Sequence, residues 1–281
     1  MNQNIFQNQY EVNEVVYKNL KKLKQNSQRV IISQKYLDME VVKTFYPSNN
    51  LKNIRNETYD EIESENFITD FQIEKKFPIV LNKISPVIRN QLASREGFIH
   101  TGLLIEDNLE IIFSNNIILI GNFKYSLYDN FDDLYIDPLN TYPNQVRSDL
   151  KKYLNNFDSG IVLGRLELNA FQSFKNKHFL RFSAGIFEEM FGGVGLDYQY
   201  YPQGSFVSLG AETYFVKKRD YSLDFNFLNY KNTLSRVNVQ AIEPRTKVKF
   251  KLSYGEYLAG DEGYTFDISR RFDNGVELGG F

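Results

Sequence analysis

The sequence contains no cysteine and no tryptophan, and it has only two histidines, His100 and His178. The lack of cysteine excludes disulfides, thiolate metal sites and cysteine nucleophiles. With two histidines, histidine-rich metal sites and two-histidine relays are not expected either. The net charge of −2 gives no global signal for binding nucleic acid or an anionic surface. We therefore expect no metal, no cofactor and no nucleic-acid partner.

Long apolar runs are also missing. No stretch of about eighteen apolar residues occurs, so no membrane-spanning helix is expected. Residues 1–16 have no basic region followed by an apolar one, so they do not read as a secretory signal. Neither absence argues against a transmembrane β-barrel, whose strands alternate apolar and polar residues. Aromatic residues, in contrast, are abundant, with 24 Phe and 19 Tyr.

The N-terminal third predicts a small mixed α/β unit. Apolar residues at helical spacing predict a helix over residues 13–28. The runs "RVIIS" (residues 29–33) and "MEVVKTFYP" (residues 39–47) predict two strands, the second ended by Pro47. A polar linker follows. Residues 71–96 show no clear pattern, and we assign no chemistry to them.

From Gly97 onward the sequence has a period of two. In "GFIHTGLLIEDNLEIIFS", residues such as Leu103 and Ile105 share one face, and Gly102 and Glu106 share the other. The pair Asn115–Asn116 then predicts a two-residue hairpin turn, because asparagine tolerates positive φ. The same alternation recurs in residues 117–128, 161–174, 178–187, 206–216 and 246–255.

This alternation fits a soluble β-sandwich or a membrane barrel, and three details favour the barrel. The polar face carries small residues and charges of both signs, aromatic residues gather near strand ends, and most connections are short. Many strands also approach the 9–11 residues that a tilted membrane strand needs. We count about eleven strands, whereas single-chain bacterial barrels use even numbers, so the barrel is expected to be incomplete.

Five separated motifs follow one another in the second half of the chain. They are "VRSDLKKYL" (146–154), "SAGIFEEMFGGVGLDYQYYP" (183–202), "VKKRDY" (216–221), "YGEYLAGDEG" (254–263) and "SRRFDNGVELGG" (269–280). In this order they resemble the YjbH/GfcD-like family of exopolysaccharide and group-4 capsule biosynthesis proteins. The resemblance is looser in residues 124–133 and faint before Gly97.

The resemblance implies an all-β transmembrane antiparallel β-barrel in the outer membrane of a Gram-negative cell. Residues 1–96 would form a small periplasmic α/β unit with a linker, and residues 97–281 the barrel. The expected partners are a polysaccharide, outer-membrane lipid and other polysaccharide secretion proteins. Family members are longer, with an N-terminal signal and two barrels, so we expect this chain to be the C-terminal portion of a longer product.

The stretch "FEEMFGGVG" (residues 187–195) combines acids with glycines. It lacks the Lys-Ser/Thr ending of a phosphate loop, so Gly192–Gly195 predict a tight turn or bulge with positive φ. On a strand, the adjacent Glu188 and Glu189 would point to opposite faces, which argues against a catalytic carboxylate pair. One of them is expected to meet a basic residue inside the barrel, and the candidates are Arg147, Arg181, Arg219 and Arg270.

We therefore predict a non-enzymatic barrel that acts as a passive conduit for polysaccharide. A plugged barrel that binds glycan or serves as an assembly scaffold is the main alternative, and an enzyme that trims the polymer is a third. The segment "AGDEG" predicts a polar hairpin turn, because its spacing does not match a calcium loop. The motif residues taken as structural or inward-facing candidates are Arg147, Tyr153, Glu188, Glu189, Gly192, Gly193, Gly195, Arg219, Asp220, Tyr257, Asp261, Arg270, Asp273 and Gly275.

Overall fold

The structure is a computed structural model. It describes residues 29–36, 39–47, 76–92, 97–135, 146–147, 149–157, 160–175, 177–202, 205–243, 245–272 and 276–281. Two antiparallel sheets lie in this part of the chain, and one of them has only two strands, β1 (Arg29–Tyr36) and β2 (Met39–Pro47). Both strands were predicted from the sequence, and the prediction is confirmed. The helix predicted over residues 13–28 lies outside the described residues.

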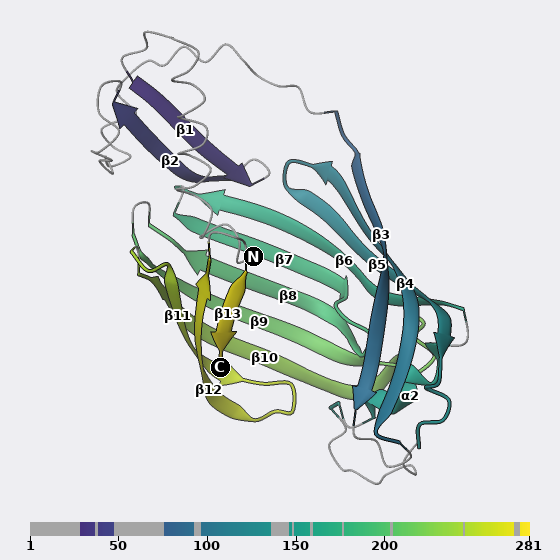
Figure 1. Cartoon of the computed structure of the whole chain (residues 1–281). Helices are drawn as coiled ribbons and strands as arrows, with labels where there is room; N and C mark the ends of the chain where they lie inside the picture. The colour runs from purple at the N-terminus through teal and green to yellow at the C-terminus, as the bar shows by residue number, and fades with distance from the viewer. Residues whose placement is uncertain are drawn as a thin grey trace.

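The larger sheet contains eleven strands, and each pairs antiparallel with its neighbour in the sequence. Figure 1 shows them side by side in a strongly twisted sheet. The strands are β3 (Ile79–Leu92), β4 (Ile99–Ser114), β5 (Ile117–Asp129), β6 (Ile161–Phe174), β7 (His178–Ile186), β8 (Phe191–Tyr200), β9 (Val207–Arg219), β10 (Phe227–Ile242), β11 (Val248–Glu256), β12 (Glu262–Arg271) and β13 (Glu277–Gly280).

The sequence analysis did not assign β3 as a strand. Half-buried side chains such as Val87 and Arg89 nevertheless alternate regularly with exposed ones such as Ile88. Pro86 lies in the middle of this strand and masks the pattern, because proline cannot donate a ladder hydrogen bond. It is tolerated because β3 is an edge strand that pairs only with β4 in the described residues. The large sheet thus begins before residue 96, where the sequence suggested a boundary. The division of the chain into two units stays a prediction.

The two faces of the large sheet differ in chemistry. One cross-strand row consists of Leu209, Val239, Leu252 and Phe266, whose exposed fractions lie between 38% and 55%. We call the face that carries this row the outer face. Alternate residues point the other way and are mostly polar or small, and we call that side the inner face. The predicted strands and their alternation are therefore confirmed, with the apolar side turned outward.

The antiparallel all-β part of the fold prediction is confirmed, whereas barrel closure is not observed. In the part of the chain that the structure describes, β3 pairs only with β4, and β13 pairs only with β12. The sheet thus has two open edges. No helix in the described residues is long and apolar enough to cross a membrane.

The connections fall at two ends of the strands. At one end, which we call the turn end, they span residues 115–116, 175–177, 201–206, 243–247 and 272–276. The predicted Asn115–Asn116 turn lies here and is confirmed. At the other end, which we call the α2 end, the connection between β5 and β6 includes the short helix α2 (Leu150–Leu154; Figure 1).

The prediction of a glycine turn in "GGVG" is wrong. Gly192, Gly193 and Gly195 lie inside β8, and none of them has positive φ. The chain turns earlier, in residues 187–190, so Glu188 and Glu189 lie in a connection and not on a strand. The glycines are needed because the neighbouring strand comes close. A Cβ atom on Gly193 would collide with the carbonyl oxygen of Phe215, which belongs to β9.

Candidate functional site

A row of charged side chains crosses the inner face. Arg181, Asp197, Glu212 and Arg236 are successive cross-strand partners on β7, β8, β9 and β10. The two acids are direct neighbours, and each has its own arginine. Arg181 Nε lies 2.9 Å from Asp197 Oδ2, and Arg236 Nε lies 2.6 Å from Glu212 Oε1. Each charge in this row is therefore offset by a charge-assisted hydrogen bond.

Two uncharged or mixed rows continue toward the turn end. Gln199, Gly210, Asn238 and Ser253 form the next row, and Ser208, Gln240, Lys251 and Asp267 form the one after it. Residues of all three rows line a cavity of about 240 Å³. We call it the mid-sheet pocket. Its donors and acceptors suit a hydroxylated ligand, because amide and charged side chains offer hydrogen bonds in both directions.

A second cavity, of about 640 Å³, lies at the α2 end. Glu189 reaches into it from the connection between β7 and β8. Its carboxylate accepts hydrogen bonds from both terminal nitrogens of Arg89, at 2.6 and 2.8 Å, and from Lys124 Nζ, at 2.7 Å. Burial by itself would raise the pKa of Glu189. The hydrogen bonds and charges of Arg89 and Lys124 outweigh it and lower this pKa to about 2.

This lowered pKa predicts an acid-dependent loss of stability. A carboxyl whose folded pKa is below its ordinary value stabilises the fold above that ordinary value, and the contribution is lost as pH falls toward about 2. We expect the free energy of unfolding of the wild type to fall by up to about 1.4 kcal/mol more per pH unit than that of Glu189→Gln between roughly pH 4.5 and 2. Urea titrations in detergent micelles at several pH values measure this difference.

Glu188→Gln is the control, because its partner is exposed. One nitrogen of Arg147 lies 2.7 and 2.8 Å from the two oxygens of Glu188, and the arginine side chain is 58% exposed. Exposed pairs contribute little to stability. Equal pH slopes for Glu189→Gln and the wild type would contradict the assignment.

Helix α2 is attached to β9 and to the connection that follows it. Asp149 accepts hydrogen bonds from Lys218 Nζ at 2.6 Å and from Tyr221 Oη at 2.7 Å, and the lysine and aspartate side chains are both only 2% exposed. Tyr153 Oη donates to the carbonyl oxygen of Arg219 at 2.6 Å. Burial and the negative charge of Asp149 raise the pKa of Tyr153, so its hydroxyl stays protonated as a donor.

Arg219 is fully buried, and among the described residues its side chain binds only backbone carbonyl groups. Its guanidinium donates to Leu163 O at 2.9 Å and to Glu189 O at 3.1 Å. It also donates to Leu223 O and Asp224 O in the connection between β9 and β10. One side chain thus connects β6 with two separate connections. The planar fork of arginine suits this role, because several of its N–H groups donate in fixed directions.

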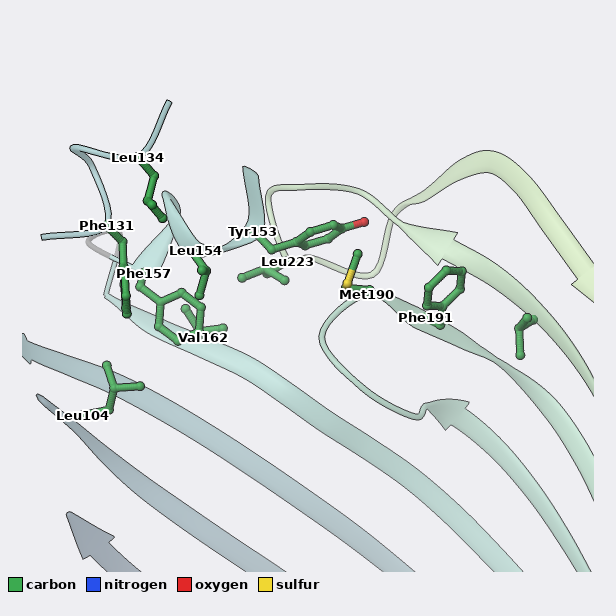
Figure 2. Packing of buried hydrophobic residues seen from close by; sticks show 11 residues of the cluster. Leu104, Phe131, Leu134, Tyr153, Leu154, Phe157, Val162, Met190, Phe191 and Leu223 are labelled. Atoms are coloured by element: carbon green, nitrogen blue, oxygen red, sulfur yellow. The ribbon is translucent and has the colours of Figure 1, made fainter. Parts of the chain in front are cut away.

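Apolar side chains fill the space around these polar contacts. Figure 2 shows Tyr153, Met190 and Leu223 close together, with Phe131 and Phe157 further along the same cluster. The rings of Phe131 and Phe157 meet edge to face at 6.2 Å. We call these residues, together with Asp149, Lys218 and Arg219, the α2 cluster. It forms the largest group of buried side chains in the described part of the sheet.

The structure brings three of the five motifs together. Arg147, Tyr153, Glu188, Glu189, Arg219 and Asp220 all lie at the α2 end, where Asp220 accepts a hydrogen bond from the backbone of Tyr221. Tyr257 and Asp261 close the predicted hairpin between β11 and β12, which is confirmed by the bond from Tyr257 N to Asp261 O. Arg270 is exposed on β12 and stacks on Phe272. Asp273 and Gly275 lie outside the described residues.

Sequence reasoning missed four residues of these sites. Asp149 and Lys218 lie inside the motifs, but nothing local shows that their charges meet. Arg89 lies in the segment to which no chemistry was assigned. Lys124 lies in residues 117–128, whose alternation predicted a strand but no charged partner. Of the four arginines considered for the two acids, Arg147 is the one that binds Glu188. Within the described residues, no group of three or more His, Cys, Asp or Glu side chains could hold a metal ion.

Comparison with known proteins agrees with the motifs. The family model described as "YjbH: Exopolysaccharide biosynthesis protein YbjH" matches residues 4–281. The chain belongs to the YjbH family. A curated YjbH relative, the "Uncharacterized lipoprotein YjbH" of Escherichia coli (strain K12), is 28% identical over 204 residues. This match covers 70% of the chain but only 29% of the length of the relative. No solved structure gives a significant match.

Proposed function

We propose that the chain forms a β-barrel or a part of one in the outer membrane, where it acts in the export of an exopolysaccharide. The observation that carries this proposal is the exposed apolar outer face over eleven strands, combined with a polar inner face. In a soluble sandwich the apolar faces of two sheets pack against each other. No second layer covers the outer face in the described residues, and lipid is the environment that suits such a face.

The connections support an orientation in the membrane. Outer-membrane barrels have short periplasmic turns and longer external loops. The turn end would then face the periplasm, and the α2 end the outside. Strand β3 starts at the turn end, so the residues before it would lie in the periplasm, as predicted for the N-terminal unit. The name of the Escherichia coli relative, which calls it a lipoprotein, supports an envelope location.

The proposed mechanism is passive. A hydrated glycan can exchange hydrogen bonds with water for bonds with the charged and amide rows of the inner face. Opposite charges that are already paired, such as Arg181 with Asp197, bind the polymer weakly because each charge is offset by its partner. Weak binding allows the polymer to pass along the inner face. We propose no covalent step, and partner proteins would supply the driving force. The chain spans less than a third of the length of its relative, so a role of that whole protein is carried to this chain only as a proposal.

A plugged scaffold is the second candidate, and the α2 cluster favours it. This cluster fills the inner side of the sheet at one end with buried side chains from β4, β6, β8, β9 and the connections between strands. A barrel closed there would anchor a secretion complex and hold glycan without conducting it. The two candidates share the outer-membrane location and differ only in whether the interior is open.

A strain that lacks the gene and planar-bilayer recordings of the full-length protein test both candidates. The proposal predicts loss of surface polysaccharide on deletion. Stable single-channel steps would favour the conduit, and their absence, with polysaccharide still lost on deletion, would favour the scaffold. Intact surface polysaccharide in the deletion strain, or a protein that stays in solution without detergent, would contradict both.

A charge on the outer face tests the membrane environment directly. Leu252 lies in the middle of the exposed apolar row. We expect Leu252→Arg to lower the free energy of unfolding from lipid bilayers by about 2–4 kcal/mol, because a cation near the bilayer midplane is costly. The change is measured by urea titration in liposomes, with band migration of unheated samples as the readout.

Leu252→Ala is the matched control, since it shortens the same side chain without adding charge. If the arginine variant were as stable as the alanine variant, the outer face would be in contact with water, and the membrane proposal would be wrong.

A further inference from the structure

The mid-sheet pocket and the larger cavity differ in how many of their polar side chains already have a hydrogen-bond or ion-pair partner. In the larger cavity, Glu189 is bound by Arg89 and Lys124. In the mid-sheet pocket, the row Arg181, Asp197, Glu212 and Arg236 is internally paired, and Tyr214 Oη adds a bond of 2.6 Å to Asp197. Of these paired groups, Arg181, Asp197 and Glu212 line the pocket.

Three residues of the two neighbouring rows are not engaged in this way. Asn238, Gln240 and Lys251 line the pocket, and Gln240 lies directly across from Lys251 between β10 and β11. Their side chains make no hydrogen bond or ion pair with any residue that the structure describes. Asp267 is the cross-strand neighbour of Lys251 on β12, but the two charges do not form an ion pair within 4.0 Å. Two amides and one ammonium group are therefore available to a ligand.

Glycine makes room for these groups. Gly210 lies between Gln199 and Asn238 in the cross-strand row, and a Cβ there would meet the amide of Asn238 at 2.6 Å. Any larger residue at this position would push Asn238 into the pocket. The resulting volume of about 240 Å³ is smaller than that of pockets for drug-sized ligands and suits a single sugar unit.

We propose that the mid-sheet pocket binds one acidic sugar unit of a polysaccharide, with Lys251 as the partner of its carboxylate. The amides of Asn238 and Gln240 would bind ring hydroxyls, and the paired acids Asp197 and Glu212 would accept hydrogen bonds from further hydroxyls. A carboxylate is the preferred partner because, of the charged side chains that line the pocket, Lys251 is the one that forms no ion pair with a described residue. An ammonium group binds an anion more strongly than a neutral hydroxyl. This inference rests on the proposed role in polysaccharide export and specifies the class of polymer.

Calorimetric titration of the full-length protein in detergent tests the proposal, with tetragalacturonate as the acidic probe and maltotetraose as the neutral one. We expect the acidic probe to bind and the neutral probe to bind at least about ten-fold more weakly. Lys251→Gln should weaken binding of the acidic probe by about ten-fold and leave the neutral probe unaffected. Since the side chain of Lys251 makes no hydrogen bond or ion pair with a described residue, the variant should fold normally, which circular dichroism checks.

Lys231→Gln is the matched control. Lys231 lies on the same strand as Asn238, is exposed, and is in phase with Val237 and Val239 of the outer face, so its loss should not change binding. No binding of the acidic probe, equal binding of both probes, or an unchanged affinity in Lys251→Gln would each overturn the proposal. None of these results would affect the wider function, which is tested separately by the deletion strain and by the membrane experiments.

Discussion

Arg219→Met is expected to lower the free energy of unfolding by more than about 3 kcal/mol. Methionine keeps much of the length and volume of the side chain, so little space is opened. What is lost is the set of hydrogen bonds to the carbonyl groups of Leu163, Glu189, Leu223 and Asp224. A buried acceptor without a donor costs about 1–3 kcal/mol, and four acceptors are affected here. Urea unfolding in detergent micelles, followed by far-ultraviolet circular dichroism, measures the change.

Two further variants separate hydrogen bonding from charge. Arg219→Lys keeps the charge but not the planar fork, and a single ammonium cannot reach carbonyls on three segments, so we expect an intermediate loss. Arg147→Met removes an exposed arginine from the same region and should change stability by no more than about 1 kcal/mol. If Arg219→Met were as stable as Arg147→Met, Arg219 would not hold the α2 end together.

Gly193→Ala is expected to prevent the pairing of β8 with β9. The added Cβ would overlap the carbonyl oxygen of Phe215, and backbone cannot rotate away as a side chain can. The strands would have to separate, at a cost of roughly 3 kcal/mol or more. The folded fraction after refolding into detergent, read from the migration of unheated samples, measures this loss.

Gly263→Ala is the corresponding control. It lies on β12, and its Cβ would meet the ring of Tyr257 at 3.6 Å, which is an ordinary van der Waals contact. We expect its folded fraction to match that of the wild type. Equal folded fractions for Gly193→Ala and Gly263→Ala would show that β8 and β9 are not as close as described.

The strands could be predicted because each carries its own signal. In β4, β6, β9 and β11 apolar and polar residues alternate over 9–16 positions, and turn residues mark the ends. Strand β3 was not recognised, since Pro86 interrupts the signal and is acceptable only on an edge. Whether a strand is at an edge depends on the arrangement of the whole sheet, which no local pattern contains.

The candidate site was predicted less completely. The motifs identified Arg147, Tyr153, Glu188, Glu189 and Arg219, but not how they are connected. Glu189 binds Arg89, which is 100 positions away in the sequence, and Asp149 binds Lys218, which is 69 positions away. The position of the turn was also wrong, because the glycines of β8 reflect a close approach of β9, and the sequence of β8 alone does not distinguish such an approach from a turn.

By itself, the sequence determined the alternating strands, the apolar and polar faces, and the family to which the chain belongs. These depend on local periodicity and on ordered motifs, both of which can be read along one chain. Only the tertiary structure decided that the apolar face is uncovered, that α2 is tied to β9 by buried charges, and that Lys251 faces a pocket without a carboxylate partner among the described residues. Each of these depends on the distances between strands, and the order of residues does not fix those distances.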